Sequence, residues 1–292
     1  MKHRNAISRR NLLQSVGAFA AADLLGSSRE VVAPATSPLS ESKGDQPPRI
    51  LALIGDRYHN PDYIRVGLDR LFGELHLPVD YTTNYDHLSR ELLQNYRLFV
   101  FLRDGMIWPG GYLGPADAYN CYEDSLENSA DFAKSEPKNW ITEEQGEAVK
   151  NFVAAGNGLY ALHNNSHVSL SSKAYREVMG GAYNGHPPQR PFKVKVVNKD
   201  HPITQGVHDF MVNDEQHFVI YDKDAKNILL RAENVDGLAY EDQGTTSISG
   251  WAHEFGKGRV VFTAVGHNIH ALWQPEHFQL QKNAVRWLLN MI

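Results

Sequence analysis

Short, continuous apolar runs recur along this chain, and most of them are followed by a segment with apolar residues at helical spacing. The runs RILALIGD (49–56), RLFVFL (97–102) and GRVVFTAVGH (258–267) have the length and composition of strands buried on both faces. Buried strands that alternate with amphipathic helices are typical of a mostly parallel, doubly wound α/β sheet with helices on both faces. The pattern therefore predicts one α/β domain over residues 49–292.

Further elements fit the same pattern. Strands are expected at 78–83 and 159–163, and helices at 63–75, 87–96, 141–158 and 276–292. After residue 190 the sequence pattern changes to short expected strands separated by turns. We expect these strands at 192–198, 217–222, 227–232, 237–242 and 247–255. They predict a β-rich C-terminal elaboration of the same domain.

The N-terminus resembles an export signal. Arg9 and Arg10 precede a mildly apolar stretch rich in Ala and Gly, and VAPA (32–35) offers a cleavage site with small residues. The apolar run is too short for a stable membrane span. We therefore expect a twin-arginine signal peptide at 1–35, a Ser- and Pro-rich linker at 36–48, and a periplasmic or secreted mature protein.

Composition excludes several classes of partner and site. The chain carries a net charge of −5 and has no basic run beyond its N-terminus, which argues against nucleic acid as a partner. Its single cysteine, Cys121, permits neither an intrachain disulfide nor a thiolate metal cluster. Because no G-x-G-x-x-G is present, no nucleotide cofactor is expected. The 14 histidines are many for 292 residues and favour metal binding or proton transfer.

A long connection separates the strand at 97–102 from the helix at 141–158. This segment (103–140) contains Trp108, Trp140 and several tyrosines among Gly, Pro and acidic residues. Connections of this length within one domain are usually functional lids or disordered, and the aromatic residues favour an ordered lid.

Polar side chains follow several of the expected strands. In open α/β sheets, ligands bind beyond the carboxyl ends of the strands, so these residues are expected at one site. They are Asp56 and His59, Arg103 and Asp104, His163 and Asn164, and His267 and Asn268. One histidine at a strand end is usually structural, whereas several that converge with carboxylates favour a functional site.

Four segments resemble the trehalose-utilisation, or ThuA-like, family in the same order. They are GNGLYALH (156–163), VMGGAYNGHPP (178–188), DHPITQGVHDFMVNDEQHF (200–218) and the block from SGWAHEFGKGRV (249–260) to RWLL (286–289). The resemblance covers residues 49–292. It implies carbohydrate metabolism and a flavodoxin-like fold similar to that of class I glutamine amidotransferases.

The chain departs from these relatives in ways that bear on chemistry. Amidotransferase relatives hold a catalytic cysteine in the turn after the strand that ends here at His163, so glutamine hydrolysis is not supported. Many ThuA-like proteins have Asp-Glu-x-Tyr where this chain has Asp214, Glu215, Gln216 and His217. His217 adds a metal ligand, and a role of the tyrosine cannot be transferred to it.

The available donors favour a divalent transition metal such as zinc, manganese, iron or nickel, although a metal-free polar cleft stays open. We expect His163, His217 and His267 as metal ligands. The catalytic candidates are Glu215, Asp104 and His59. The substrate-binding candidates are Arg103, Asn164, His186, Trp251 and His270. Trp251 could stack on a sugar ring or pack in the core, and His277 is expected at the surface or as a helix cap.

Three functions remain open. The first, which the resemblance implies, is metal- or acid/base-assisted elimination or isomerisation of a 3-keto sugar made by a partner oxidoreductase. Because this chain has no G-x-G-x-x-G, the hydride chemistry would belong to that partner. The second is a non-catalytic periplasmic carbohydrate-binding protein. The third is glycoside hydrolysis by the carboxylates of Asp104 and Glu215. All three take a sugar or glycoside as ligand.

Overall fold

A computed structural model describes residues 47–109 and 136–292 of the chain. The expected signal peptide, nearly all of the expected linker, Cys121 and the middle of the segment 103–140 lie outside these residues.

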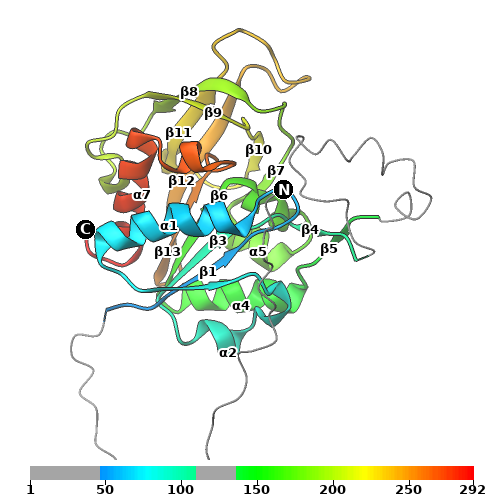
Figure 1. Cartoon of the computed structure of the whole chain (residues 1–292), viewed down its shortest axis with the longest axis vertical. Coiled ribbons are helices and arrows are strands. Elements are labelled where there is room, and N and C mark those ends of the chain that lie inside the picture. The colour runs from blue at the N-terminus through cyan, green and yellow to red at the C-terminus, as the bar shows by residue number, and fades with distance from the viewer. Residues whose placement is uncertain (1–46, 110–135) are drawn as a thin grey trace, which may run out of the picture. The chain divides into compact units, whose positions relative to one another are not determined.

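Nine of the described strands form one mixed sheet in the order β2-β1-β3-β6-β13-β12-β11-β8-β9 (Figure 1). The first five are parallel, and their order is that of flavodoxin-like sheets. They are β2 (Val79–Thr82), β1 (Ile50–Ile54), β3 (Leu98–Leu102), β6 (Gly158–Leu162) and β13 (Gly258–Thr263). The predicted α/β class is confirmed.

Antiparallel strands continue the sheet beyond β13 and form the expected C-terminal elaboration. They are β12 (Thr246–Phe255), β11 (Ile228–Glu233), β8 (Arg190–Val196) and β9 (Phe210–Asp214). The prediction of a strand at 237–242 was wrong. That segment forms turns, with Gly237 and Glu241 in the left-handed region at φ 75° and 48°. Strand β9 was not predicted.

Two small antiparallel sheets flank the main one. One pairs β7 (Gly181–Tyr183) with β10 (Val219–Tyr221), and the other pairs β4 (Met106–Ile107) with β5 (Lys138–Asn139). The second pair ties together the two described ends of the segment 103–140. Trp140 follows it and donates its indole N–H to the carbonyl of Asp104 at 2.7 Å.

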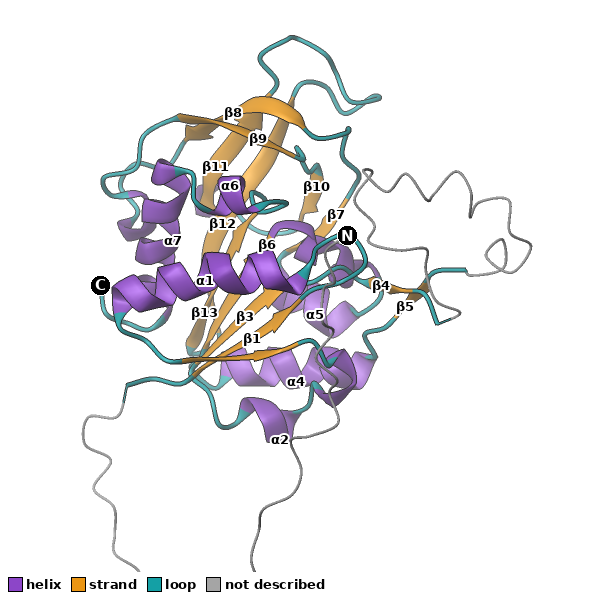
Figure 2. Cartoon of the chain, viewed as in Figure 1, coloured by secondary structure: helices purple, strands orange, loops and turns teal. Residues whose placement is uncertain are grey.

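Helices cover both faces of the parallel strands (Figure 2). Along β1, Ile50 and Ala52 face one core and Leu51 and Leu53 the other, as the twofold repeat of a strand requires. The first core contains α1 (Pro61–Leu75) and α7 (Pro275–Leu288), and the second contains α2 (Arg90–Leu93), α4 (Glu143–Ala154) and α5 (Lys173–Met179). Helix α4 starts with a capping box formed by Thr142 and Gln145.

The antiparallel strands curl back toward the carboxyl ends of the parallel strands. Strands in a flat sheet lie about 4.8 Å apart, so β9 would be about 19 Å from β13, four places away. Instead, the Asp214 side chain at the end of β9 accepts a hydrogen bond at 2.7 Å from the N–H of Gly266, just beyond β13. The elaboration therefore returns its last strand to the carboxyl ends of the parallel strands.

Among the described helices, none has both the length and the apolar character that crossing a bilayer requires.

His277, expected at the surface or as a helix cap, is fully buried in the first turn of α7. Its Nδ1 lies 3.0 Å from the carbonyl oxygen of Ala271. Burial lowers the pKa of His277 to about 4, so the ring is neutral at pH 7.

We expect His277 to make the fold sensitive to acid. Because its folded pKa is below the unfolded value of 6.5, the unfolded chain binds the proton first, and stability falls as the pH drops from 6.5 to about 4. The effect is on the order of 3 kcal/mol. Urea denaturation across this range should show a flatter profile for His277→Gln than for the wild type. His208→Gln, at an exposed histidine, should keep the wild-type profile.

Candidate metal and acid–base site

The carboxyl ends of the parallel strands bring the predicted polar residues to one edge of the sheet. His59 follows β1, Asp104 follows β3, His163 follows β6 and His267 follows β13. Glu215 joins them from the end of β9 because the elaboration curls back. The rings of His59 and His163 lie 4.8 Å apart between centroids, and those of His59 and His267 lie 5.0 Å apart.

His163 occupies a strained turn between β6 and the 3₁₀ segment η2 (His163–Leu170). Its φ of 54° lies in the left-handed region, which costs a non-glycine residue on the order of 1–3 kcal/mol. Its Nδ1 lies 2.8 Å from the carbonyl oxygen of Ala264, so it carries the proton and Nε2 is left with a lone pair. This buried Nε2 has no hydrogen-bond partner among the described residues and lies 3.4 Å from Glu215 Oε2.

A buried carboxylate orients His59. Asp56 Oδ1 and Oδ2 lie 2.9 and 3.0 Å from His59 Nδ1, and His59 Nε2 lies 3.1 Å from His267 Nδ1. Asp56 also accepts the N–H of Asp104 at 2.8 Å. Burial alone would raise the pKa of Asp56, but His59 and the backbone donors hold it well below its usual range. A carboxylate behind a histidine is the usual support of a metal ligand.

Among the described residues, four imidazoles surround one oxygen of Glu215. Glu215 Oε2 lies 3.4 Å from His163 Nε2, 3.4 Å from His217 Nε2, 3.3 Å from His267 Nδ1 and 3.7 Å from His186 Nε2. Burial would raise the pKa of Glu215, but the surrounding rings of His163, His217 and His267 hold the pKa far below its usual range. Glu215 is therefore an ionised carboxylate inside a shell of histidines.

The spacing of these atoms fits a transition metal. A tetrahedral site with bonds of about 2.1 Å has ligand atoms about 3.4 Å apart. His59, His163, Glu215 and His267 form one group whose donor atoms all lie within 4.8 Å of one another, and His186, Glu215 and His217 form another. The expected ligands His163 and His267 thus lie with His59, previously expected only as a catalytic group, whereas His217 lies in the second group.

Asp214 fixes the position of Glu215 relative to His267. Its fully buried side chain accepts backbone N–H bonds from Glu215 at 2.8 Å, Gly266 at 2.7 Å and His267 at 3.1 Å. Gly266 packs closely against His163, because a Cβ there would lie 3.1 Å from that of His163. A movement of the loop after β13 would therefore disturb both His163 and the end of β9 that carries Glu215.

Asp104 has the properties of an acid–base group. Burial raises the pKa of Asp104 to about 6 against the effect of His167, and the charge of Asp56 adds to the rise. Asp104 Oδ1 lies 3.7 Å from His167 Nδ1, and Asn164 Nδ2 lies 3.4 Å from Oδ2. A carboxyl group with this pKa exchanges protons near neutral pH.

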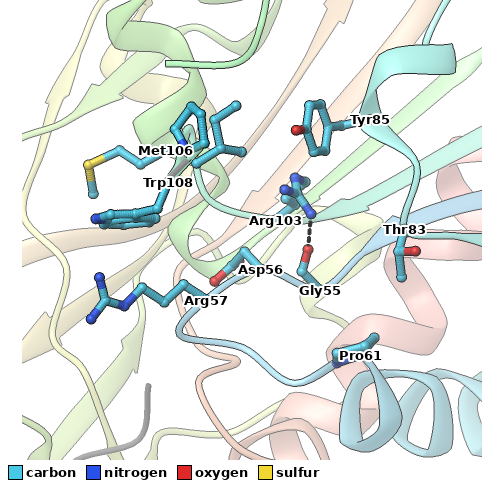
Figure 3. A pocket seen from close by; sticks show the side chains of 11 residues that line it. Gly55, Asp56, Arg57, Pro61, Thr83, Tyr85, Arg103, Met106 and Trp108 are labelled. Atoms are coloured by element: carbon cyan, nitrogen blue, oxygen red, sulfur yellow. Dashed lines mark hydrogen bonds between the residues drawn. The ribbon is translucent and has the colours of Figure 1, made fainter. Parts of the chain in front are cut away.

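A cavity of about 460 Å³ opens beside the ends of β1 and β3 (Figure 3). Asp56 and Arg103 line its inner wall, and Arg57 lies over the ring of Trp108 at 4.7 Å. Arg103 donates to the carbonyl of Gly55, and its guanidinium lies 4.4 Å from the Tyr85 ring centroid. The volume falls in the range of small-molecule sites.

Two of the expected substrate-binding residues lie elsewhere. Trp251 is fully buried in β12, where its indole N–H donates to the Met179 carbonyl at 2.9 Å and its ring packs on Phe262 at 4.2 Å. It belongs to the core, so its assignment to a sugar site was wrong. His270 is exposed on α6 (Ile269–Leu272) and is not part of either histidine group. Asn164 is buried at the site, where its Nδ2 donates at 3.2 Å to Asp56 Oδ2, the carboxylate that holds His59.

Residue type alone did not identify the supporting groups. Asp56 was noted at a strand end, but its contact with His59 depends on a three-residue turn. Asp214 stands beside Glu215 in the sequence, and nothing in that pairing reveals that it binds the loop after β13. His167 lies near Asp104 because η2 follows β6 directly.

Comparisons with known proteins agree with this fold. The family model "ThuA: Trehalose utilisation" matches residues 56–288. Two structures titled putative ThuA-like proteins are similar. The one from Bacteroides uniformis has 16% identity and a TM-score of 0.59 over 87% of this chain and 95% of its own. The one from Parabacteroides merdae has 15% identity and a TM-score of 0.60 over 84% and 91%.

A more distant likeness is to a β-galactosidase from Rahnella sp. R3. Its identity is 12% and its TM-score 0.51, over 85% of this chain but only 32% of that enzyme. At these identities the structural matches show the fold alone. No curated protein sequence matches this chain.

The role of Asp214 leads to a stability prediction. In Asp214→Asn one acceptor oxygen becomes an NH₂ group facing a backbone N–H, so we expect a loss of about 1–3 kcal/mol in the free energy of unfolding. Chemical denaturation at pH 7 measures it. Asn213→Ala, exposed on the same strand, should change stability by less than about 0.5 kcal/mol. Equal stabilities of Asp214→Asn and the wild type would show that Asp214 does not hold the loop.

Proposed function

Because the chain belongs to the trehalose-utilisation (ThuA) family, we propose that it is a metal-dependent enzyme that moves a proton on a sugar substrate. The observation that carries this proposal is the shell of four imidazole nitrogens 3.3–3.7 Å from Glu215 Oε2. A protein that only binds sugar needs no such concentration of ionisable groups. Histidine and carboxylate donors are the set that zinc, manganese, iron and nickel accept.

The ligands proposed for this metal are His59, His163, His267 and Glu215. When bound, a divalent metal would act as a Lewis acid toward a substrate carbonyl. Asp56 and the Ala264 carbonyl hold the Nδ1 atoms of His59 and His163, so that each ring presents Nε2 to the site. The fold thus supplies preorganised ligands.

Asp104 is the proposed proton carrier. In a 3-keto sugar the hydrogen at C2 is acidic, and the ionised carboxylate of Asp104 would accept it. The electron pair released forms the C1–C2 double bond, the C1–O bond to the aglycone breaks, and the departing oxygen takes a proton from water. The cavity beside β1 and β3, with Arg103 on its wall, is the proposed sugar subsite.

Elimination from a methyl 3-keto-glucoside tests this function. Chelator-treated protein is loaded with Zn²⁺, Mn²⁺, Fe²⁺ or Ni²⁺ in turn, and methanol release and the unsaturated sugar are followed by chromatography. We expect turnover only with metal. Absence of turnover with every metal would contradict the enzyme, and sugar binding without turnover would favour a carbohydrate-binding protein.

The pH profile of the same assay tests Asp104. Because Asp104 accepts the proton only as an ionised carboxylate, kcat/KM should rise with pH through about 6, the pKa of Asp104, and level off above it. Asp104→Asn should lower kcat/KM by about 10²–10⁴-fold and remove this acid limb. Asp242→Asn, in an exposed turn, should change neither kcat/KM nor the acid limb of the pH profile. An unchanged limb in Asp104→Asn would assign the proton transfer to another group.

The proposal includes export, which rests on the pattern at Arg9 and Arg10. A keto substrate would come from an oxidoreductase that holds its own nucleotide cofactor, since this chain has no matching motif. Replacing both arginines by lysine should keep the protein in the cytoplasm, because twin-arginine signals are read by a receptor. Immunoblots of periplasmic and cytoplasmic fractions measure this, and unchanged periplasmic protein would contradict it.

A further inference from the structure

The histidines around Glu215 fall into two groups among the described residues. His59, His163 and His267 share Glu215 in the first group, and His186 and His217 share it in the second. Two ligands of one ion lie at most two bond lengths apart, about 4.4 Å for bonds of about 2.2 Å. The donor atoms of the two groups do not all lie within 4.8 Å of one another, so a single ion does not bind both groups.

We propose that Glu215 bridges two metal positions, and that His186 and His217 are the other protein ligands of the second. This proposal rests on the metal-dependent function above and extends it. Carboxylate-bridged pairs of metal ions about 3.5–4 Å apart are common in enzymes that act on oxygen-bearing substrates. The rings of His163 and His217, one from each group, lie 4.4 Å apart between centroids.

Backbone pairing builds the second position without help from a metal. Strands β7 and β10 pair Tyr183 with Val219, and the N–H of Phe218 donates to the carbonyl of Gly185 at 2.8 Å. This register places His186, just after β7, beside His217, just before β10, and their rings stack at 5.0 Å. Gly185, which precedes His186, has a φ of 97°, and a Cβ there would lie 2.6 Å from the Tyr240 hydroxyl. The turn that leads into His186 therefore requires glycine at this position.

A hydrogen bond orients the His186 ring, and burial holds the His217 ring. His186 Nδ1 lies 2.8 Å from the carbonyl oxygen of Pro187, so its Nε2 is left to face Glu215 at 3.7 Å. His217 is buried and directs Nε2 to the same oxygen at 3.4 Å. Each ring thus presents one nitrogen to the carboxylate, as a ligand requires.

The two positions differ in their number of protein donors. The first position has four and the second has three. Each group includes one partly exposed histidine, His267 at 21% in the first and His186 at 30% in the second. A position with three protein ligands and an opening to solvent is the kind that accepts substrate oxygens. An ion at the second position would therefore have room to hold neighbouring oxygens of a sugar.

Metal stoichiometry tests the proposal. Full-length protein is stripped with chelator, incubated with excess Zn²⁺, desalted and analysed by inductively coupled plasma mass spectrometry. We expect two zinc ions per chain in the wild type and one in His186→Gln. His59→Gln should also lose one, and His208→Gln, at an exposed histidine outside both groups, should keep two. Circular dichroism checks that each variant is folded.

A measurement on the wild type covers the case in which a variant fails to fold. Two Mn²⁺ ions bridged by one carboxylate are magnetically coupled, so the electron paramagnetic resonance spectrum should broaden beyond that of an isolated ion when the second equivalent binds. Saturation at one ion per chain, or two ions retained in folded His186→Gln, would overturn the second position and leave the proposed function intact. No retained metal at all would overturn both.

Discussion

The contact between Asp214 and the loop after β13 holds the two parts of the site together. β9 is at the far edge of the sheet, yet its last side chain bonds the backbone of Gly266 and His267. Such a contact requires the antiparallel strands to curl strongly, as strands with right-handed twist readily do. Without that curl Glu215 would lie far from every histidine that follows a parallel strand.

The site is therefore divided between the parallel and the antiparallel parts of one sheet. The parallel strands carry His59, His163 and His267, and the elaboration carries Glu215 and His217. The parallel half provides rigid positions, since its strands are buried on both faces. The elaboration provides the carboxylate on which the imidazoles converge. A metal bound at this boundary would stabilise the docking of the two parts as well as the site.

Much of this arrangement was readable in the sequence because it depends on local patterns. Apolar runs predicted the buried strands, and the rule that parallel strands end at one edge of the sheet predicted that His163 and His267 lie together. The position of Glu215 depends on a curl that no local pattern encodes, and β9 was missed. Trp251 and the segment 237–242 were misassigned because an aromatic side chain and a β-rich composition each suit two environments.

The strained turn at His163 has a consequence for how such a fold changes its chemistry. The left-handed backbone there accompanies the turn from β6 into η2 and the close approach of Gly266, so every non-glycine residue at this position bears a conformational cost. Exchanging His163 for another non-glycine residue would therefore change the chemical group that faces Glu215 without changing the direction in which the backbone presents it.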